Sequence, residues 1–215
     1  MRESGSYQYT YNFNWMGLPI IQFPQDVVAM QEILWAVKPD LVIETGIARG
    51  GSLAFYASIL ELLGGNGHVL GIDIDIRAHN RAAIEAHPMA KRISMIQGSS
   101  VDDGVADQVR RFAAGYKRPL VALDSNHTHE HVLREMQLYS PMVQAGSYLV
   151  VFDTSIEDQP MTDYPGRPWS KVSNPKTAVR EFLATNDRFV IDEAVDDKLL
   201  LTVARDGFLR CTRDP

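Results

Sequence analysis

The sequence predicts an α/β protein built on a doubly wound, mostly parallel sheet. Five short apolar runs recur at intervals suited to alternating strands and helices, and their near-continuous apolar character is typical of parallel strands covered on both faces. Helix-like stretches, with apolar residues three or four positions apart, lie between these runs. A glycine-bearing loop joins the first run to the stretch that follows it. Sheets of this kind bind ligands at the carboxyl ends of their strands, so we expect a functional site there.

The expected parallel strands are the five apolar runs at residues 41–43, 69–72, 93–96, 120–123 and 148–152. A helix precedes the first of them, because Val27, Met30, Leu34 and Val37 form one apolar stripe that stops before Pro39. Later helices are indicated by two further apolar stripes, Val101, Val105, Val109 and Phe112, and then Val132, Leu133, Met136, Tyr139 and Val143.

The pattern changes after the fifth strand. Residues 154–175 contain four prolines and Trp169, which predicts a long loop. A helix over 176–184 is expected next, followed by two strands near 189–191 and 199–203.

Size and composition exclude several classes of protein. The 215 residues are 45% hydrophobic, which fits one globular domain over residues 1–215. A net charge of -6 argues against a nucleic-acid partner. The single cysteine, Cys211, excludes an internal disulfide and a cysteine-based zinc site. The sequence has no apolar signal core at its start and no run of 18 apolar residues, so we expect a cytoplasmic protein without a membrane partner.

The loop after the first strand is the most informative segment. Glu44 ends the apolar run, glycines stand at 46, 50 and 51, and Ser52 opens the following helix. A glycine loop at this place turns backbone N–H groups and the positive end of the helix dipole toward a ligand. The spacing G-x-x-x-G-G is neither that of a dinucleotide loop nor that of a phosphate loop. Glu44 disfavours a pyrophosphate there and favours a ligand that carries positive charge.

Polar residues also follow the other four strands. Asp73, the pair Ser99 and Ser100, Asp124 and Asp153 each stand at an expected strand end. Because the carboxyl ends of parallel strands meet at one edge of the sheet, these residues predict a single polar site.

Four motifs carry a resemblance to a known family: Glu-Thr-Gly-Ile-Ala-Arg-Gly-Gly-Ser at 44–52, Gly-Ile-Asp-Ile-Asp at 71–75, Leu-Asp-Ser-Asn-His-Thr-His at 123–129 and Asn-Pro-Lys-Thr-Ala-Val at 174–179. Over nearly the whole chain, the sequence resembles S-adenosylmethionine-dependent O-methyltransferases, and most closely the cephalosporin hydroxylase family. The order of the motifs is also similar to that of the metal-dependent catechol O-methyltransferases. The resemblance implies a Rossmann-like, seven-stranded sheet whose final strand is antiparallel.

The resemblance implies how S-adenosylmethionine would bind. The methionine end would lie at Gly46 and Ser52, the ribose at Asp73, and the adenine beside Ser99 and Ser100. The residue Glu44 would lie near the cationic part of the cofactor, although a buried acid bonded to loop N–H groups is the alternative. The full cofactor-binding set that the resemblance implies is Glu44, Gly46, Gly50, Ser52, Asp73, Ser99, Ser100 and Asp124.

The resemblance also implies a Mg²⁺ site. Asp124 and Asp153 would be its ligands, and Mg²⁺ prefers such oxygen ligands. The third position holds Thr154, where catechol-type enzymes carry Asn or Asp, and the alternative third ligands are Glu157 and Asp158.

His127 is the expected general base, since it falls three residues after Asp124, where catechol-type enzymes place a lysine. Moving a proton from a phenol (pKa about 10) to a histidine (pKa about 6.5) is uphill by roughly 5 kcal/mol. Coordination of the acceptor oxygen to Mg²⁺ would offset most of this cost, which leaves histidine an adequate base near neutral pH. Asp124 and His127 are therefore the expected catalytic residues.

The run of histidines at 127, 129 and 131 leaves a zinc site as an alternative. If a helix starts at about residue 128, only His127 and His131 share a face, and no distant Cys or His pair completes the site. An iron-dependent hydroxylase is not supported, because no histidine has Asp or Glu two positions later.

Two segments flank the expected core. The aromatic-rich stretch at 7–15, within an N-terminal segment 1–23, could close over the acceptor, pack on a second subunit or form a strap on the sheet edge. Trp169, with Tyr164, Arg167 and Lys171, lies in the loop 154–175, which should border the acceptor.

The sequence thus predicts an S-adenosylmethionine-dependent O-methyltransferase, assisted by Mg²⁺, that acts on a hydroxylated small molecule. A nicotinamide-dependent oxidoreductase is disfavoured by the glycine spacing. A non-catalytic S-adenosylmethionine-binding partner of a biosynthetic hydroxylase system stays open, because Thr154 is a poor metal ligand. A homo-oligomer is also open.

Overall fold

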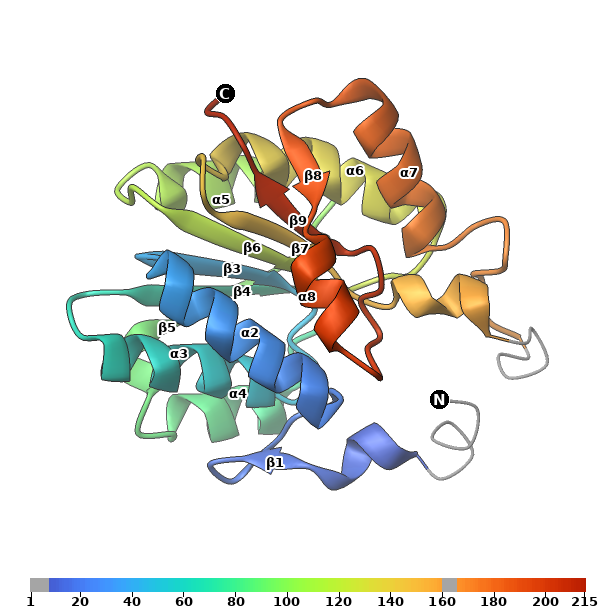
Figure 1. Ribbon diagram of the computed structural model, residues 1–215. Coiled ribbons are helices and arrows are strands. Elements are labelled where there is room, and N and C mark those ends of the chain that lie inside the picture. The colour runs from blue at the N-terminus through green and yellow to red at the C-terminus, as the bar shows by residue number, and fades with distance from the viewer. Residues whose placement is uncertain (1–7, 160–165) are drawn as a thin grey trace.

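The computed structural model describes residues 8–159 and 166–215, in which a seven-stranded sheet lies between two layers of helices (Figure 1). Residues 1–7 of the predicted N-terminal segment 1–23, and Tyr164 of the predicted loop, lie outside these residues. In chain order the strands are β3 (Leu41–Thr45), β4 (His68–Asp73), β5 (Ile93–Gln97), β6 (Pro119–Leu123), β7 (Tyr148–Val151), β8 (Phe189–Ile191) and β9 (Phe208–Cys211).

The strand order across the sheet is β5-β4-β3-β6-β7-β9-β8. The first five strands pair in parallel, and β9 runs antiparallel to both of its neighbours. The predicted Rossmann-like, mostly parallel sheet with an antiparallel final strand is therefore confirmed. The chain builds outward from β3 to β5 and then returns to place β6 on the other side of β3, which opens a crevice at their carboxyl ends.

The strands are apolar on both faces because helices cover both faces. In β3, Val42 packs into one core, whereas Leu41 and Ile43 pack into the other. One layer contains α2 (Pro24–Val37), α3 (Gly51–Leu63) and α4 (Ala78–Glu85), and the other contains α5 (Asp103–Ala113), α6 (His129–Tyr139) and α7 (Pro175–Thr185) (Figure 1). The short helix α8 (Glu193–Lys198) joins the first layer. In the part of the chain that the structure describes, no helix has the length and apolar character needed to cross a bilayer.

The N-terminal segment is a strap that is fixed to α3. It contains the 3₁₀ helix η1 (Tyr9–Asn12) and a hairpin of β1 (Asn14–Trp15) and β2 (Leu18–Pro19). The indole of Trp15 donates a hydrogen bond to the Ser58 hydroxyl at 2.9 Å, and its ring meets the edge of Phe55. The hairpin therefore covers a helix rather than the sheet edge, and it carries η1 to the end of the molecule where the parallel strands finish (Figure 1).

The prediction of a final strand near 199–203 was wrong. That segment is irregular, and the last strand is β9, at Phe208–Cys211. The backbone of the 199–203 segment bonds to other groups instead of a sheet: the Val203 N–H donates to Asp26, and the Val203 carbonyl accepts from the Ser155 N–H. The predicted loop at 154–175 also begins with a 3₁₀ helix, η4 (Thr154–Asp158).

Candidate active site

Several cavities lie along the carboxyl ends of the parallel strands, among them one of about 590 Å³ lined by Arg49, Asp73 and Arg77, and three others contain most of the predicted residues. The central cavity, of about 270 Å³, is lined by residues of the glycine loop and by Asp124, His127 and Asp153. The strap cavity, of about 240 Å³, lies beside η1 and shares Asp124 and Asp153 with the central one. The serine cavity, of about 190 Å³, is lined by residues that include Asp73, Ser99 and Ser100 and meets the central cavity at Gly46. The predicted strand-end residues are thus brought to one edge of the sheet.

Glycine is required at two positions of the loop between β3 and α3. Gly46 has φ +91°, and a Cβ there would lie 2.0 Å from the carbonyl oxygen of Asp124, so the loop can cross the end of β6 only without a side chain. Gly50 has φ +85° and directly precedes α3. The loop leaves the first residues of α3, Gly51 and Ser52, in the wall of the central cavity.

Glu44 supports this loop from within. It is fully buried, and its Oε2 accepts a hydrogen bond from the Ser52 hydroxyl at 2.7 Å. Burial raises the pKa of Glu44 to about 8, although the hydrogen bond from Ser52 acts in the opposite direction. Ser52 lines the central cavity, but Glu44 does not line any of the three cavities.

Asp73 ties the end of β4 to the glycine loop. Its Oδ2 accepts from the Ile47 N–H at 2.8 Å and from the Ala48 N–H at 3.3 Å, and its Oδ1 accepts from the Asp75 N–H at 3.0 Å. The residue also lines the serine cavity, together with Ser99 and Ser100. Carboxylates have about four lone-pair positions, so these bonds leave room for a ligand hydroxyl.

Asp124, His127 and Asp153 form the candidate metal-binding cluster of the site. One ligand atom from each lies within 4.8 Å of the other two, and Nε2 of His127 is 3.2 Å from Oδ2 of Asp153. The group forms because β6 and β7 are parallel neighbours, so the loops that follow them start side by side. Asp153 adopts the left-handed conformation, with φ +56°, where the chain turns from β7 into η4.

Asp124 is held in an environment that disfavours its charge. Burial raises its pKa well above the usual value, and the nearby carboxyls of Asp153 and Glu44 raise it further. A cation bound between the carboxylates would relieve this repulsion.

The structure does not bring Thr154 into this group. Its hydroxyl is buried and donates to the carbonyl of Arg205 at 2.6 Å, on the protein side of the loop. Glu157 pairs with Arg180 through two hydrogen bonds of 2.8 Å, and Asp158 pairs with Lys176 at 3.2 Å.

The three clustered histidines lie in different surroundings. His129 contacts Thr177 and Glu181 of α7, whereas His131 lines the serine cavity beside Ser100. The zinc site that the sequence left as an alternative does not form among the described residues, since only His127 of the three lies with Asp124 and Asp153.

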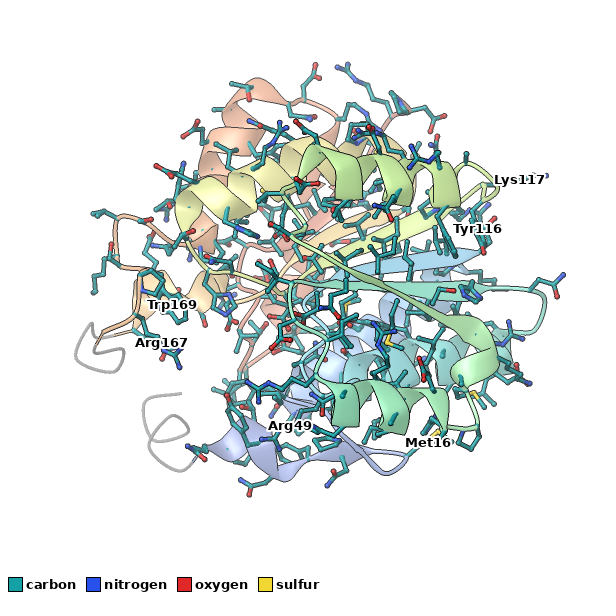
Figure 2. All side chains as sticks on the ribbon, turned by 180° about the vertical axis from the view of Figure 1, so that it is seen from behind. Met16, Arg49, Tyr116, Lys117, Arg167 and Trp169 are labelled. Carbon is teal, nitrogen blue, oxygen red and sulfur yellow. The ribbon has the colours of Figure 1, made fainter. Side chains whose placement is uncertain are left out.

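Arg49 lines the central cavity, and Trp169 contacts His127 of the same cavity. The guanidinium of Arg49 lies 5.9 Å from the ring centre of Tyr11, and the ring of Trp169 meets that of His127 edge-on at 4.8 Å. Figure 2 shows Arg49, Arg167 and Trp169 at the same end of the molecule, opposite Tyr116 and Lys117. Arg167 lies over Trp169 at 5.1 Å, and Trp169 in turn contacts His127, so the described end of the loop before α7 lies beside that histidine.

Sequence reasoning missed Gln22 and Ser125. Gln22 lines the central and strap cavities, and Ser125 lines the central and serine cavities. Ser125 follows Asp124 and could have been found from that neighbourhood. Gln22 stands in no motif, and only the path of the strap brings it to the site.

A family model described as rhamnosyl O-methyltransferase/CmcI matches residues 7–212. The chain belongs to this family. The O-methyltransferase class predicted from the motifs is thereby confirmed, whereas the name cephalosporin hydroxylase is not.

Proteins that carry the name rhamnosyl O-methyltransferase are similar to this chain in sequence. A rhamnosyl O-methyltransferase of Mycobacterium leprae (strain TN) is 34% identical over 197 residues, which are 91% of this chain and 81% of the relative. One of Mycobacterium tuberculosis (strain ATCC 25618 / H37Rv) is 36% identical over 151 residues, which are 68% of this chain and 59% of the relative.

Solved structures share the fold. A CmcI structure with Mg and SAM has a TM-score of 0.67 at 20% identity, with 94% of this chain and 77% of that one covered. The MycE methyltransferase in complex with Mg, SAH and mycinamycin VI has a TM-score of 0.54 at 19% identity, with 99% and 53% covered.

Proposed function

We propose that this protein transfers the methyl group of S-adenosylmethionine to a sugar hydroxyl, with Mg²⁺ held by Asp124 and Asp153 and with His127 as general base. The observation that carries the proposal is the convergence of these three side chains in the wall of the central cavity, beside the glycine loop. An acceptor oxygen and a cofactor methyl group can meet at this place.

The cofactor would extend from the serine cavity into the central one. Asp73 would accept the ribose hydroxyls, and Ser99 and Ser100 would border the adenine. The methionine end would lie against Gly46 and Ser52, at the N-terminus of α3, where backbone N–H groups favour a carboxylate. A CmcI structure that shares this fold binds Mg and SAM, which supports the choice of cofactor.

The donor set suits Mg²⁺. Asp124 and Asp153 offer carboxylate oxygens, Mg²⁺ keeps several of its waters, and the raised pKa of Asp124 marks a place where negative charge lacks a partner. A bound ion would supply Lewis-acid stabilisation of the acceptor oxyanion.

The protein's own residues would move the proton. The imidazole of His127 would accept the proton of the acceptor hydroxyl at the ring nitrogen that is not paired with Asp153. Its Nε2 lies 3.2 Å from Oδ2 of Asp153, so the Nε2–H would donate to that carboxylate and orient the ring. Contact with the Trp169 ring would hold the imidazole from the side.

The acceptor would enter through the strap cavity. Its described lining contains neutral polar side chains, among them Thr10, Tyr11 and Gln22, and its acidic residues are Asp124 and Asp153. Such a lining favours a neutral, hydroxylated molecule. The relatives that carry the name rhamnosyl O-methyltransferase support a sugar.

Calorimetry with S-adenosylhomocysteine, with and without Mg²⁺, tests the proposal together with turnover of methyl α-L-rhamnopyranoside. Micromolar binding that is lost in Asp73→Ala, and turnover that is lost in His127→Ala, are expected. A protein that binds S-adenosylhomocysteine but methylates no hydroxylated acceptor would instead be a cofactor-binding partner protein. A protein that binds neither ligand would end the proposal.

A further inference from the structure

Gln22 lies in the wall that separates the central cavity from the strap cavity. It stands between β2 and α2, its side chain is only 3% exposed, and it lines both cavities. Neither Nε2 nor Oε1 of its carboxamide has a hydrogen-bond partner among the described residues.

A buried carboxamide without partners is costly. Desolvation of each unsatisfied polar group costs about 1–3 kcal/mol, so buried amides are nearly always paired. Other buried polar atoms in residues 8–159 and 166–215 also lack hydrogen bonds, including those of Glu44, Tyr56 and Glu135, but those three side chains do not line these two cavities. The unpaired carboxamide of Gln22 is therefore placed to meet a molecule that enters the cavities.

The neighbours of Gln22 define where that molecule would lie. Asp124 and Asp153 line the same two cavities as Gln22. A molecule bound by Gln22 would therefore lie next to the candidate metal-binding cluster. The carboxamide of Gln22 lies close enough to Asp124 and to Tyr56 to lower the pKa of both groups, although it forms no hydrogen bond of ordinary geometry with either.

We propose that the carboxamide of Gln22 binds a second hydroxyl of the acceptor, beside the hydroxyl that is methylated. This inference rests on the proposed function. A carboxamide both donates and accepts, as a hydroxyl does, so the two pair without either being charged. Gln22 thereby selects a neutral acceptor with two hydroxyls close together and orients one of them toward His127 and the carboxylates.

The test compares methyl α-L-rhamnopyranoside with its 2-deoxy, 3-deoxy and 4-deoxy analogues, with Mg²⁺ present. Gln22→Leu removes the hydrogen-bonding atoms and keeps the approximate volume. Gln25→Leu is the matched control, because Gln25 also has a buried, unpaired Oε1 but does not line the cavities. Affinities for S-adenosylhomocysteine and Mg²⁺ are measured for every variant.

The deoxy analogue that lacks the methylated hydroxyl should not be turned over. Of the other two, the wild type should prefer the full rhamnoside to one by about tenfold in kcat/KM, the size expected for one hydrogen bond. Gln22→Leu should abolish that preference, lower kcat/KM for the full rhamnoside by about tenfold, and leave the two affinities unchanged. Gln25→Leu should retain the preference.

Other results would overturn the inference and would also separate it from the proposed function. If the tenfold preference persists in Gln22→Leu, or if the wild type turns over the full rhamnoside and the two analogues that keep the methylated hydroxyl equally well, the role of Gln22 is removed but methyl transfer is kept. Loss of Mg²⁺ affinity in Gln22→Leu would make the residue a support of Asp124. If the protein binds S-adenosylhomocysteine and Mg²⁺ but turns over no rhamnoside, the inference of an acceptor with two neighbouring hydroxyls is wrong. If it binds neither S-adenosylhomocysteine nor Mg²⁺, the proposed function is wrong as well.

Discussion

Nε2 of His127 lies 3.2 Å from Oδ2 of Asp153, although the two residues belong to loops that follow different strands. This contact links the loop that follows β6 to the loop that follows β7 and fixes the orientation of the imidazole. The ring of Trp169 meets the imidazole edge-on from another side.

Replacement of His127 by Ala should lower kcat by about 10²–10⁴-fold, the usual contribution of a general base. Binding of S-adenosylhomocysteine should be unchanged, because His127 makes none of the bonds of the glycine loop. Steady-state kinetics and calorimetry on the same preparation give both values. His129→Ala is the control, since His129 faces α7, and equal losses in the two variants would contradict the role of His127.

Replacement of Asp153 by Asn should weaken Mg²⁺ binding at least tenfold, because it removes one of the two carboxylates that would hold the ion. Asp158→Asn is the matched control, since Asp158 lies nearby in η4 but pairs with Lys176. Titration with Mg²⁺ in the presence of S-adenosylhomocysteine distinguishes them. Unchanged Mg²⁺ affinity in Asp153→Asn would show that the ion, if bound, is held elsewhere.

Replacement of Thr154 by Val should reduce the free energy of unfolding by about 1–2 kcal/mol, because the backbone carbonyl of Arg205 loses the hydroxyl that donates to it at 2.6 Å, whereas the Val203 carbonyl still accepts from the Ser155 N–H. Mg²⁺ affinity should not change. Urea denaturation and a Mg²⁺ titration measure the two effects. A variant that keeps its stability but loses Mg²⁺ affinity would restore Thr154 as the third ligand.

Replacement of Gly46 by Ala should destabilise the fold by several kcal/mol, since the new Cβ would lie 2.0 Å from the Asp124 carbonyl oxygen. The loss in Gly46→Ala has two causes, the steric clash and the positive φ. Gly17→Ala separates them, because Gly17 has φ +93° but nothing within 4 Å of its Cβ position. It should cost only about 1 kcal/mol, from backbone conformation alone. Thermal unfolding compares the two, and equal losses would exclude the clash as the main cause.

Replacement of Glu44 by Gln should change how stability depends on pH. The raised pKa, about 8 in the folded state against an ordinary 4.5, means that the folded protein holds this proton more tightly than the unfolded chain. The wild type should therefore lose stability as pH rises from about 4.5 to about 8, by on the order of a few kcal/mol. The carboxamide introduced by Glu44→Gln has no proton to lose, so the variant should lack this slope.

Urea titrations of the protein without cofactor or metal, at several pH values, measure the effect of Glu44→Gln. The two proteins should be equally stable below pH 4.5, and the variant should be more stable above pH 8. Parallel curves across the whole range would mean that Glu44 is ionised in the fold at neutral pH.

Local sequence patterns were sufficient to predict the layers of the fold and most of the polar edge. Period and composition are local properties, and a near-continuous apolar run such as 120–123 has to be covered on both faces wherever it lies. The position of Gly46 was equally readable, because a tight loop before a helix excludes side chains. Because β6 and β7 are parallel neighbours, Asp124 and Asp153, which directly follow them, lie at the same edge of the sheet.

Which polar groups face the cavities depends instead on contacts between distant parts of the chain. Thr154 turns inward because the carbonyl of Arg205 is within reach, and Gln22 lies at the site because the strap is fixed on α3 by Trp15. The irregular path of 199–203 likewise depends on Asp26, far away in the chain. A hydrogen bond is chosen among partners that only the folded chain brings together, so local sequence patterns do not determine these contacts.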